Sequence, residues 1–190
     1  MRDYDAIVFD LDGTLADTMP AHYAAWRKVL DPMGIPFPEE VFYGFGGVPT
    51  LKILDILSAR HGVAMDIRRV SEQKEDFFAE GLGAIRPIPE VLAVAEAHLG
   101  VVPMAVATGG HDRVVYRTLE ALGIGGWFGA VVTVDDVTHG KPHPETFALA
   151  AQKLGVEPTR CLAYEDADPG IASAKAAGMQ VIDVRLLRAR

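Results

Sequence analysis

The sequence predicts an α/β fold in which helices flank a parallel sheet. Short apolar runs, several of them rich in β-branched residues, recur along the chain and end at polar residues. In the second half of the chain these runs alternate with segments of helical periodicity. Because two parallel strands are joined by a long and usually helical crossover, this alternation favours a parallel sheet. The expected strands contain Ala6-Ile7-Val8-Phe9, Met104-Ala105-Val106-Ala107, Val131-Val132-Thr133-Val134, Leu162-Ala163-Tyr164 and Val181-Ile182-Asp183-Val184.

Three helices are expected among the last four strands, because apolar residues there recur three or four positions apart. Each of these segments stops at a glycine, a residue that favours the left-handed conformation at helix ends: Gly123, Gly155 and Gly178. The last segment also opens with Asp168-Pro169, an acidic residue and a proline that are typical of a first turn. The pattern therefore places one helix in each of these crossovers.

Residues 17–85 interrupt the alternation and predict three or four helices without a strand. Apolar stripes run from Met19 to Met33 and from Ile67 to Phe78, and Pro49 opens a further helical segment between them. Because this insertion follows the first strand directly, we expect a small helical cap over the carboxyl end of that strand. The alternative is a helical subdomain that packs on the core and has no role at the site. The expected domains are an α/β core of residues 1–16 and 86–190 and a helical cap of residues 17–85.

Composition and charge limit the classes of partner. The 190 residues carry a net charge of −8 without a run of basic residues, which argues against nucleic acid as a partner. The single cysteine, Cys161, cannot form a disulfide within the chain and fits a reducing compartment. The most apolar stretch, residues 91–107, is broken by Glu96 and Pro103, so no membrane span or targeting segment is expected. We expect a cytoplasmic protein; a monomer is compatible with the sequence, which favours no oligomeric state.

Acidic residues follow two of the expected strands. Asp10 and Asp12 come directly after the first strand, and the carboxyl ends of parallel strands are where α/β proteins bind their ligands. The alternative for this pair is a simple turn built on Asp12-Gly13. Glu165-Asp166 follows the fourth strand, and adjacent acids repel one another unless a cation joins them. The two strand ends together predict a cation site.

Two further strand ends supply groups that suit an anion. Thr108-Gly109 follows the second strand and offers a hydroxyl and a flexible backbone amide at the start of a helix. Lys141 follows the third strand in a loop stiffened by two prolines, where a solvated surface lysine is the alternative. Together with the four acids, these groups suit a Mg²⁺ ion that keeps some of its waters and shares a phosphate.

The histidines are not expected to bind metal. The spacing in the sequence predicts solvated or structural roles for His61, His98, His111, His139 and His143.

The strand-end motifs resemble the four ordered motifs of the haloacid dehalogenase-like (HAD) hydrolase superfamily. The motifs are Asp10-Leu11-Asp12-Gly13-Thr14, Thr108-Gly109, Lys141-Pro142-His143-Pro144 and Glu165-Asp166. The resemblance spans nearly the whole chain and implies a Rossmann-like core with a helical cap. Further features are similar to the β-phosphoglucomutase-like branch, especially its fructose-1-phosphate phosphatase-like members: Asp17-Thr18, His22, Trp26, the turn Gly47-Val48-Pro49-Thr50, Lys74 and Glu165-Asp166.

The resemblance implies a role for each site residue. Asp10 would be the nucleophile that takes the phosphoryl group as an aspartyl-phosphate, and Asp12 the acid that protonates the leaving oxygen and then the base for water. Lys141 would assist catalysis and, with the Thr108 hydroxyl and the Gly109 N–H, bind the phosphoryl oxygens. Mg²⁺ would be held by the Asp10 carboxylate, the Asp12 backbone carbonyl and Asp166, with Glu165 binding it directly or through water.

The expected function is a Mg²⁺-dependent phosphatase acting on a small sugar phosphate similar to fructose 1-phosphate. The resemblance places four cap residues toward the substrate: Thr18, His22, Thr50 and Lys74. Thr18 is also a candidate helix cap, and His22 a candidate structural imidazole.

Three other functions were weighed against this one. A β-phosphoglucomutase-like isomerase is disfavoured because Thr50 stands where such mutases carry an arginine for a second phosphate. A dehalogenase would lack an aspartate at the place of Asp12. A non-catalytic sugar-phosphate-binding regulator would have no reason to retain both Asp10 and Asp12.

Overall fold

The computed structural model describes residues 3–46 and 48–188. Gly47, the first residue of the turn noted at residues 47–50, lies outside the described residues. The chain divides into two compact units, Met1–Asp17 with Arg86–Arg190 and Thr18–Ile85. The first boundary falls one residue later than the one expected from the sequence. We call the two parts the core unit and the helical unit.

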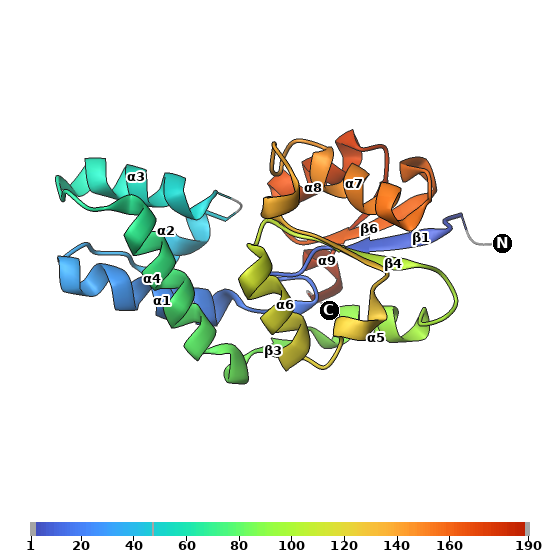
Figure 1. Cartoon of the computed structure of the whole chain (residues 1–190), viewed down its shortest axis with the longest axis horizontal. Helices are drawn as coiled ribbons and strands as arrows, with labels where there is room; N and C mark the ends of the chain where they lie inside the picture. The colour runs from blue at the N-terminus through green and yellow to red at the C-terminus, as the bar shows by residue number, and fades with distance from the viewer. Residues whose placement is uncertain (1–2, 47, 189–190) are drawn as a thin grey trace. The chain divides into compact units, whose positions relative to one another are not determined.

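A five-stranded parallel sheet forms the centre of the core unit, in the order β5-β4-β1-β6-β7 (Figure 1). The strands are β1 (Ala6–Phe9), β4 (Met104–Ala107), β5 (Ala130–Val132), β6 (Cys161–Glu165) and β7 (Gln180–Asp183). All four residues of β1 are fully buried, as expected for a central strand covered on both faces. The expected α/β fold with a parallel sheet is therefore confirmed.

The third expected strand run, residues 131–134, extends too far. The strand ends at Val132, and Val134–Asp136 forms a short 3₁₀ helix. Side-chain hydrogen bonds explain the change, because the Thr133 N–H donates to the Asp136 carboxylate and the Asp135 N–H donates to the Thr133 hydroxyl. The capped turn takes the chain out of the sheet before the loop that carries Lys141.

Helices cover both sides of this sheet. They are α5 (Pro89–Ala97), α6 (Asp112–Ala121), α7 (Glu145–Leu154), α8 (Asp168–Ala176) and the short α9 (Arg185–Arg188). Figure 1 shows α7 and α8 on one side of the strands and α5 and α6 on the other. Phe147 of α7 and Ala174 of α8 pack against alternate strand residues such as Val8 and Ala163, which share one face of the sheet.

A two-stranded antiparallel ribbon, β2 (Ala16–Asp17) with β3 (Arg86–Pro87), joins the two passages of the chain at the edge of the core unit. The pairs are Ala16 with Pro87 and Asp17 with Arg86. The ribbon brings the start and the end of the inserted segment side by side.

The helical unit contains four α-helices and no strand among its described residues, in agreement with the expected helical pattern. These are α1 (Met19–Leu30), α2 (Glu39–Gly44), α3 (Thr50–His61) and α4 (Ile67–Glu80). The unit has an apolar core of its own, in which Trp26, Phe37 and Leu54 are almost fully buried. In the described part of the whole chain, no helix has the length and apolar character needed to cross a bilayer.

Candidate active site

The carboxyl ends of β1 and β6 bring three acidic side chains together. β1 pairs with β6 in parallel register, with Phe9 opposite Tyr164, so Asp10 after β1 comes next to Glu165 at the end of β6. One carboxylate oxygen from each of Asp10, Glu165 and Asp166 lies within 4.8 Å of the others. Three oxygen ligands at this spacing can hold a metal ion, and oxygen is the ligand atom that Mg²⁺ prefers.

Lys141 bridges two of these carboxylates. Its Nζ donates to Asp10 Oδ1 at 2.7 Å and to Glu165 Oε2 at 2.6 Å. The Lys141 side chain is 12% exposed and its ammonium lies 4.9 Å from the centre of the Phe147 ring. Lys141 is therefore not a solvated surface lysine. We call Asp10, Lys141, Glu165 and Asp166 the carboxylate centre.

The carboxylate centre has an excess of negative charge, and this shifts its acidities. Burial raises the pKa of Asp10 well above its ordinary value, repulsion from Glu165 adds to the shift, and Lys141 opposes it. Burial and then Glu165 raise the pKa of Asp166 to about 6. Burial lowers the pKa of Lys141, but attraction to Asp10 and Glu165 outweighs burial and raises it overall. A bound cation would relieve this repulsion, so the donor set fits a divalent metal.

Two glycines and a threonine contact the carboxylates of Glu165 and Asp166. The sequence analysis did not assign this role to them. A Cβ at Gly13, whose φ is +84°, would overlap the Asp166 carboxylate, and a Cβ at Gly170 would overlap the Glu165 carboxylate. The Thr14 hydroxyl donates to Asp166 Oδ1 at 3.2 Å. Gly170 had a signal in the sequence, because a glycine in the first turn of a helix costs stability unless close packing requires it.

The turn after β4 lies beside Asp12. Thr108 is buried, and its Oγ1 accepts a hydrogen bond from the Gly110 N–H at 3.0 Å. A Cβ at Gly110 would be in ordinary contact with Asp12 Oδ2 at 3.6 Å and with Thr108 Oγ1 at 3.5 Å, but would lie only 2.9 Å from Val115 Cγ2. A Cβ at Gly109 would meet no atom within 4 Å, so packing does not require glycine there. Asp12 thus adjoins the turn predicted to bind phosphate.

The predicted cap residues lie in the helical unit, where two of them touch. Lys74 is almost fully buried, with Nζ 3.0 Å from His22 Nδ1 and 2.8 Å from Glu75 Oε1. The His22 ring stacks on Phe78 at a centroid distance of 4.0 Å. The Thr18 carbonyl accepts a hydrogen bond from the His22 N–H at 2.9 Å. The roles of Thr18, His22, Thr50 and Lys74 toward a substrate stay predictions.

Thr18 does not act as a side-chain cap, although a capping role had been weighed for it. It occupies the cap position of α1, but its hydroxyl makes no capping hydrogen bond. Thr18 Oγ1 is buried and has no hydrogen-bond partner among the described residues. A buried hydroxyl of this kind is available to a ligand.

Two of the histidines for which the sequence predicts solvated or structural roles lie close to each other and to a carboxylate. Ligand atoms of His139, His143 and Glu145 lie within 4.8 Å of one another. The loop around Lys141 folds back on the start of α7, and this non-helical geometry carries no periodic signal in the sequence.

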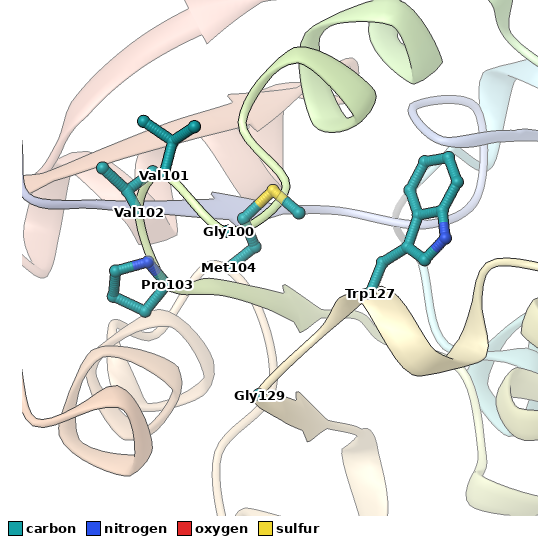
Figure 2. Close-up of a pocket in the computed structure, with 7 residues that line it drawn as sticks. All are labelled: Gly100, Val101, Val102, Pro103, Met104, Trp127 and Gly129. Atoms are coloured by element: carbon teal, nitrogen blue, oxygen red, sulfur yellow. The ribbon is translucent and has the colours of Figure 1, made fainter.

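A separate hollow of about 360 Å³ lies at the amino end of β4, away from the carboxylate centre (Figure 2). It is lined by Gly100, Val101, Val102, Pro103, Met104, Trp127 and Gly129. None of these lining residues has an ionisable side chain, so the hollow offers no acid, base or metal ligand.

Comparisons with known proteins identify the family of this chain. The haloacid dehalogenase-like hydrolase family model matches residues 4–178. Fructose-1-phosphate phosphatase YqaB of Escherichia coli is 40% identical over 185 residues, covering 97% of this chain and 98% of the relative. The phosphorylated carbohydrates phosphatase of Thermotoga maritima is 30% identical over 182 residues, covering 94% of this chain and 83% of the relative.

A solved structure supports the fold. The crystal structure of β-phosphoglucomutase from Clostridium difficile superposes with a TM-score of 0.84, over 95% of this chain and 84% of that one. At 24% identity this likeness shows the fold alone. The expected enzyme class, a phosphoric monoester hydrolase of the HAD type, is confirmed by the family match and the phosphatase relatives. The chain belongs to the haloacid dehalogenase-like hydrolase family.

Proposed function

We propose that this protein is a Mg²⁺-dependent phosphatase that hydrolyses a small phosphorylated sugar, with fructose 1-phosphate as the first candidate, through an aspartyl-phosphate on Asp10. The observation that carries the proposal is the carboxylate centre, in which Lys141 bridges Asp10 and Glu165 at the ends of two adjacent strands. The names of the two phosphatase relatives support the substrate class.

The position of Asp10 supports the proposed role as nucleophile. Its backbone N–H donates to the Tyr164 carbonyl at 2.9 Å, which fixes the residue at the strand end, and Lys141 holds its Oδ1. In the proposed first step, an Asp10 carboxylate oxygen attacks phosphorus, and the bond between phosphorus and the sugar oxygen breaks. Asp10, Asp166, Glu165 and the Asp12 carbonyl would hold Mg²⁺, which when bound supplies positive charge to the carboxylates and the phosphoryl oxygens.

Asp12 is proposed to move the protons. Asp12 follows the proposed nucleophile Asp10 by two residues, and its carboxylate lies beside the turn of residues 108–110. In the first step Asp12 gives its proton to the departing sugar oxygen. In the second step it takes a proton from water as that water attacks phosphorus, so the bond from phosphorus to Asp10 breaks and inorganic phosphate leaves.

Lys141, the Thr108 hydroxyl and the Gly109 N–H are proposed to bind the phosphoryl oxygens. Thr108 and Gly109 lie between the end of β4 and the start of α6. The Thr108 N–H donates to the Val132 carbonyl and the Gly110 N–H to the Thr108 hydroxyl, so the Gly109 N–H is the one proposed for a phosphoryl oxygen. Hydrogen bonds of this kind stabilise charge that develops on the transferring group. We further propose that Thr18, His22, Thr50 and Lys74 select the sugar.

The test is phosphate release with MgCl₂ from hexose, pentose and hexitol phosphates and from phosphoglycolate. We expect release from at least one sugar phosphate, and none from the same substrate with Asp10→Asn. β-Glucose 1-phosphate is included, with its products identified. Conversion to glucose 6-phosphate without phosphate release would favour the mutase alternative, and absence of release from every substrate would overturn the proposal.

A further inference from the structure

We propose that His139, His143 and Glu145 form a second metal site, separate from the carboxylate centre, that binds a divalent transition-metal ion such as Zn²⁺. We call it the histidine site. It lies on the loop that carries Lys141 and at the start of α7. The ligands would be one imidazole nitrogen from each histidine and one oxygen from Glu145. The proposed phosphatase chemistry uses none of these three side chains, so the inference does not depend on it.

The donor atoms are spaced for a small tetrahedral ion. His139 Nδ1 lies 3.1 Å and His143 Nδ1 lies 3.7 Å from the same oxygen, Glu145 Oε2. With bond lengths of about 2.0–2.2 Å, two ligands of a tetrahedral Zn²⁺ ion are about 3.3 Å apart. The two observed separations lie on either side of this value. His143 Nδ1 also accepts a hydrogen bond from the Glu145 N–H at 3.3 Å, so a zinc ion at this nitrogen would replace that bond.

The carboxylate of the histidine site is already oriented. Glu145 Oε1 accepts a hydrogen bond from the Thr138 N–H at 2.9 Å, and Oε2 accepts one from the His139 N–H at 3.0 Å. These bonds lower the pKa of Glu145 and favour its ionised form, and the bond from the Thr138 N–H has the largest effect. Hydrogen bonds that hold a ligating carboxylate in place are a usual feature of metal sites.

The second histidine is anchored through its backbone. The Ser173 hydroxyl of α8 donates to the His143 carbonyl at 2.6 Å, which ties the loop to a helix thirty residues away in sequence. The His139 and His143 rings are tilted against each other, with centroids 4.7 Å apart. Both rings thus lie near the same carboxylate, on a loop held by the hydrogen bonds of Ser173 and Glu145. A loop that is already ordered loses less conformational entropy when an ion binds.

The two metal sites of the core unit differ in ligand chemistry. Imidazole nitrogens favour Zn²⁺, Cu²⁺ or Ni²⁺, whereas the all-oxygen carboxylate centre suits Mg²⁺. The side chains of His139 and His143 are 63% and 51% exposed, so an ion there can be reached from solution and can complete its coordination with water. A simple hydrogen bond from a His139 ring N–H to Glu145 is the competing explanation, and in that case no ion would bind.

Zinc binding to the histidine site is best measured in a variant whose carboxylate centre has lost two of its metal ligands. The full chain carrying Asp10→Asn and Asp166→Asn is freed of metal and titrated with ZnCl₂ by calorimetry. We expect one Zn²⁺ per chain, and a loss of affinity of at least about tenfold when His143→Gln is added to this background. His61→Gln, in α3 of the helical unit, is the matched control and should bind as the background does. Absence of binding, or equal affinity with His143→Gln, would overturn the inference.

A second measurement uses the unaltered chain and guards against variants that fold poorly. The six histidines are followed through their ring nitrogens by NMR while ZnCl₂ is added in the presence of MgCl₂. We expect large shifts for two of them, assigned to His139 and His143 by the loss of one signal in each single glutamine variant. Shifts confined to other histidines, or none, would contradict the proposed site.

Discussion

Each unit of this protein buries one lysine, and the two lysines have different surroundings. Lys141 in the core unit contacts two carboxylates from the ends of neighbouring strands, within a group of three acids. Lys74 in the helical unit contacts one carboxylate, Glu75, and the His22 imidazole. The Lys74 ammonium also lies 5.8 Å and 5.6 Å from the ring centres of Trp26 and Phe78.

We propose that Lys141 serves the reaction, whereas Lys74 serves packing or recognition of the substrate. At the carboxylate centre the acids outnumber the lysine, so the donor set fits a further cation. Around Lys74 the ion pair with Glu75 balances the charge, and two aromatic rings lie close to the ammonium. We therefore expect changes at the carboxylate centre to stop the chemistry, and changes at Lys74 to alter which sugar is accepted.

Asp10→Asn should have the largest effect. An amide is a poor nucleophile and carries no charge for a cation, so phosphate release should fall by at least about 10⁴-fold. The measurement is the rate with MgCl₂, with the circular dichroism spectrum and melting temperature as checks of folding. Activity close to that of the unaltered protein would show that the nucleophile is another residue.

Lys141→Met and Lys74→Met test the comparison of the two lysines directly. On an aryl phosphate, Lys141→Met should reduce kcat/KM by about 10²–10³-fold, because a donor to the transferring group is lost. Lys74→Met should change it by less than about threefold on the aryl phosphate but reduce it by about tenfold on a sugar phosphate. Equal losses for the two variants on both substrates would remove the distinction between reaction and recognition.

Gly170→Ala tests how closely the carboxylate centre is packed. The added methyl group would overlap Glu165, so we expect a loss of about 1–3 kcal/mol in the free energy of unfolding. Gly125→Ala is the matched control, because its Cβ would meet no atom within 4 Å. Denaturant unfolding of the metal-free proteins gives both values. A stable Gly170→Ala variant would mean that Glu165 can move away from its place beside Lys141.

The response to Mg²⁺ should depend on pH, and the sign follows from Asp166. Its pKa is raised from 3.8 to about 6 in the folded metal-free protein, so the folded state binds this proton more tightly than the unfolded chain. The contribution of Asp166 to stability is therefore present below pH 3.8 and is lost as the pH rises through about 6. Mg²⁺ competes with that proton, so its binding strengthens as the pH rises over the same range.

We expect MgCl₂ to raise the melting temperature more at neutral pH than at pH values below the pKa of Asp166, which is about 6. Using the difference with and without Mg²⁺ removes the contribution of surface carboxyls such as Asp31, whose pKa is lowered by its hydrogen bond from Arg27. Asp166→Asn should reduce the pH dependence of this difference, and the part that remains is expected from Asp10, whose pKa is also raised. An increase that is independent of pH would contradict metal binding at Asp166.

The sheet and the strand-end residues could be predicted because their signals are local. A buried strand such as β1 is a continuous apolar run, and the polar residues that end it stand out. The β2–β3 ribbon could not be predicted in this way, because each strand has two residues and β3 contains Arg86 and Pro87. Pairings this short depend on where distant segments of the chain meet.

The parts of the site that were missed are those set by three-dimensional packing. Gly170 lies far from Asp10 in sequence, and only the close approach of Glu165 to its backbone explains it. The histidine site depends on a loop that returns to Glu145, so no helical or strand period joins its ligands. Sequence patterns found the groups that follow strands, Lys141 in its loop included; they did not find the glycine contacts or the cluster of His139, His143 and Glu145.

The central claim is that Asp10 accepts the phosphoryl group, and a trapped intermediate tests it most directly. Asp12→Ala removes the proposed base for water, so the phosphorylated protein should accumulate when this variant meets an aryl phosphate in MgCl₂. Acid quenching and peptide mass spectrometry then locate the group. We predict a burst of about one aryl alcohol per chain, with phosphate on the peptide that contains Asp10. Turnover without a phosphorylated peptide, or phosphate on another residue, would contradict the account.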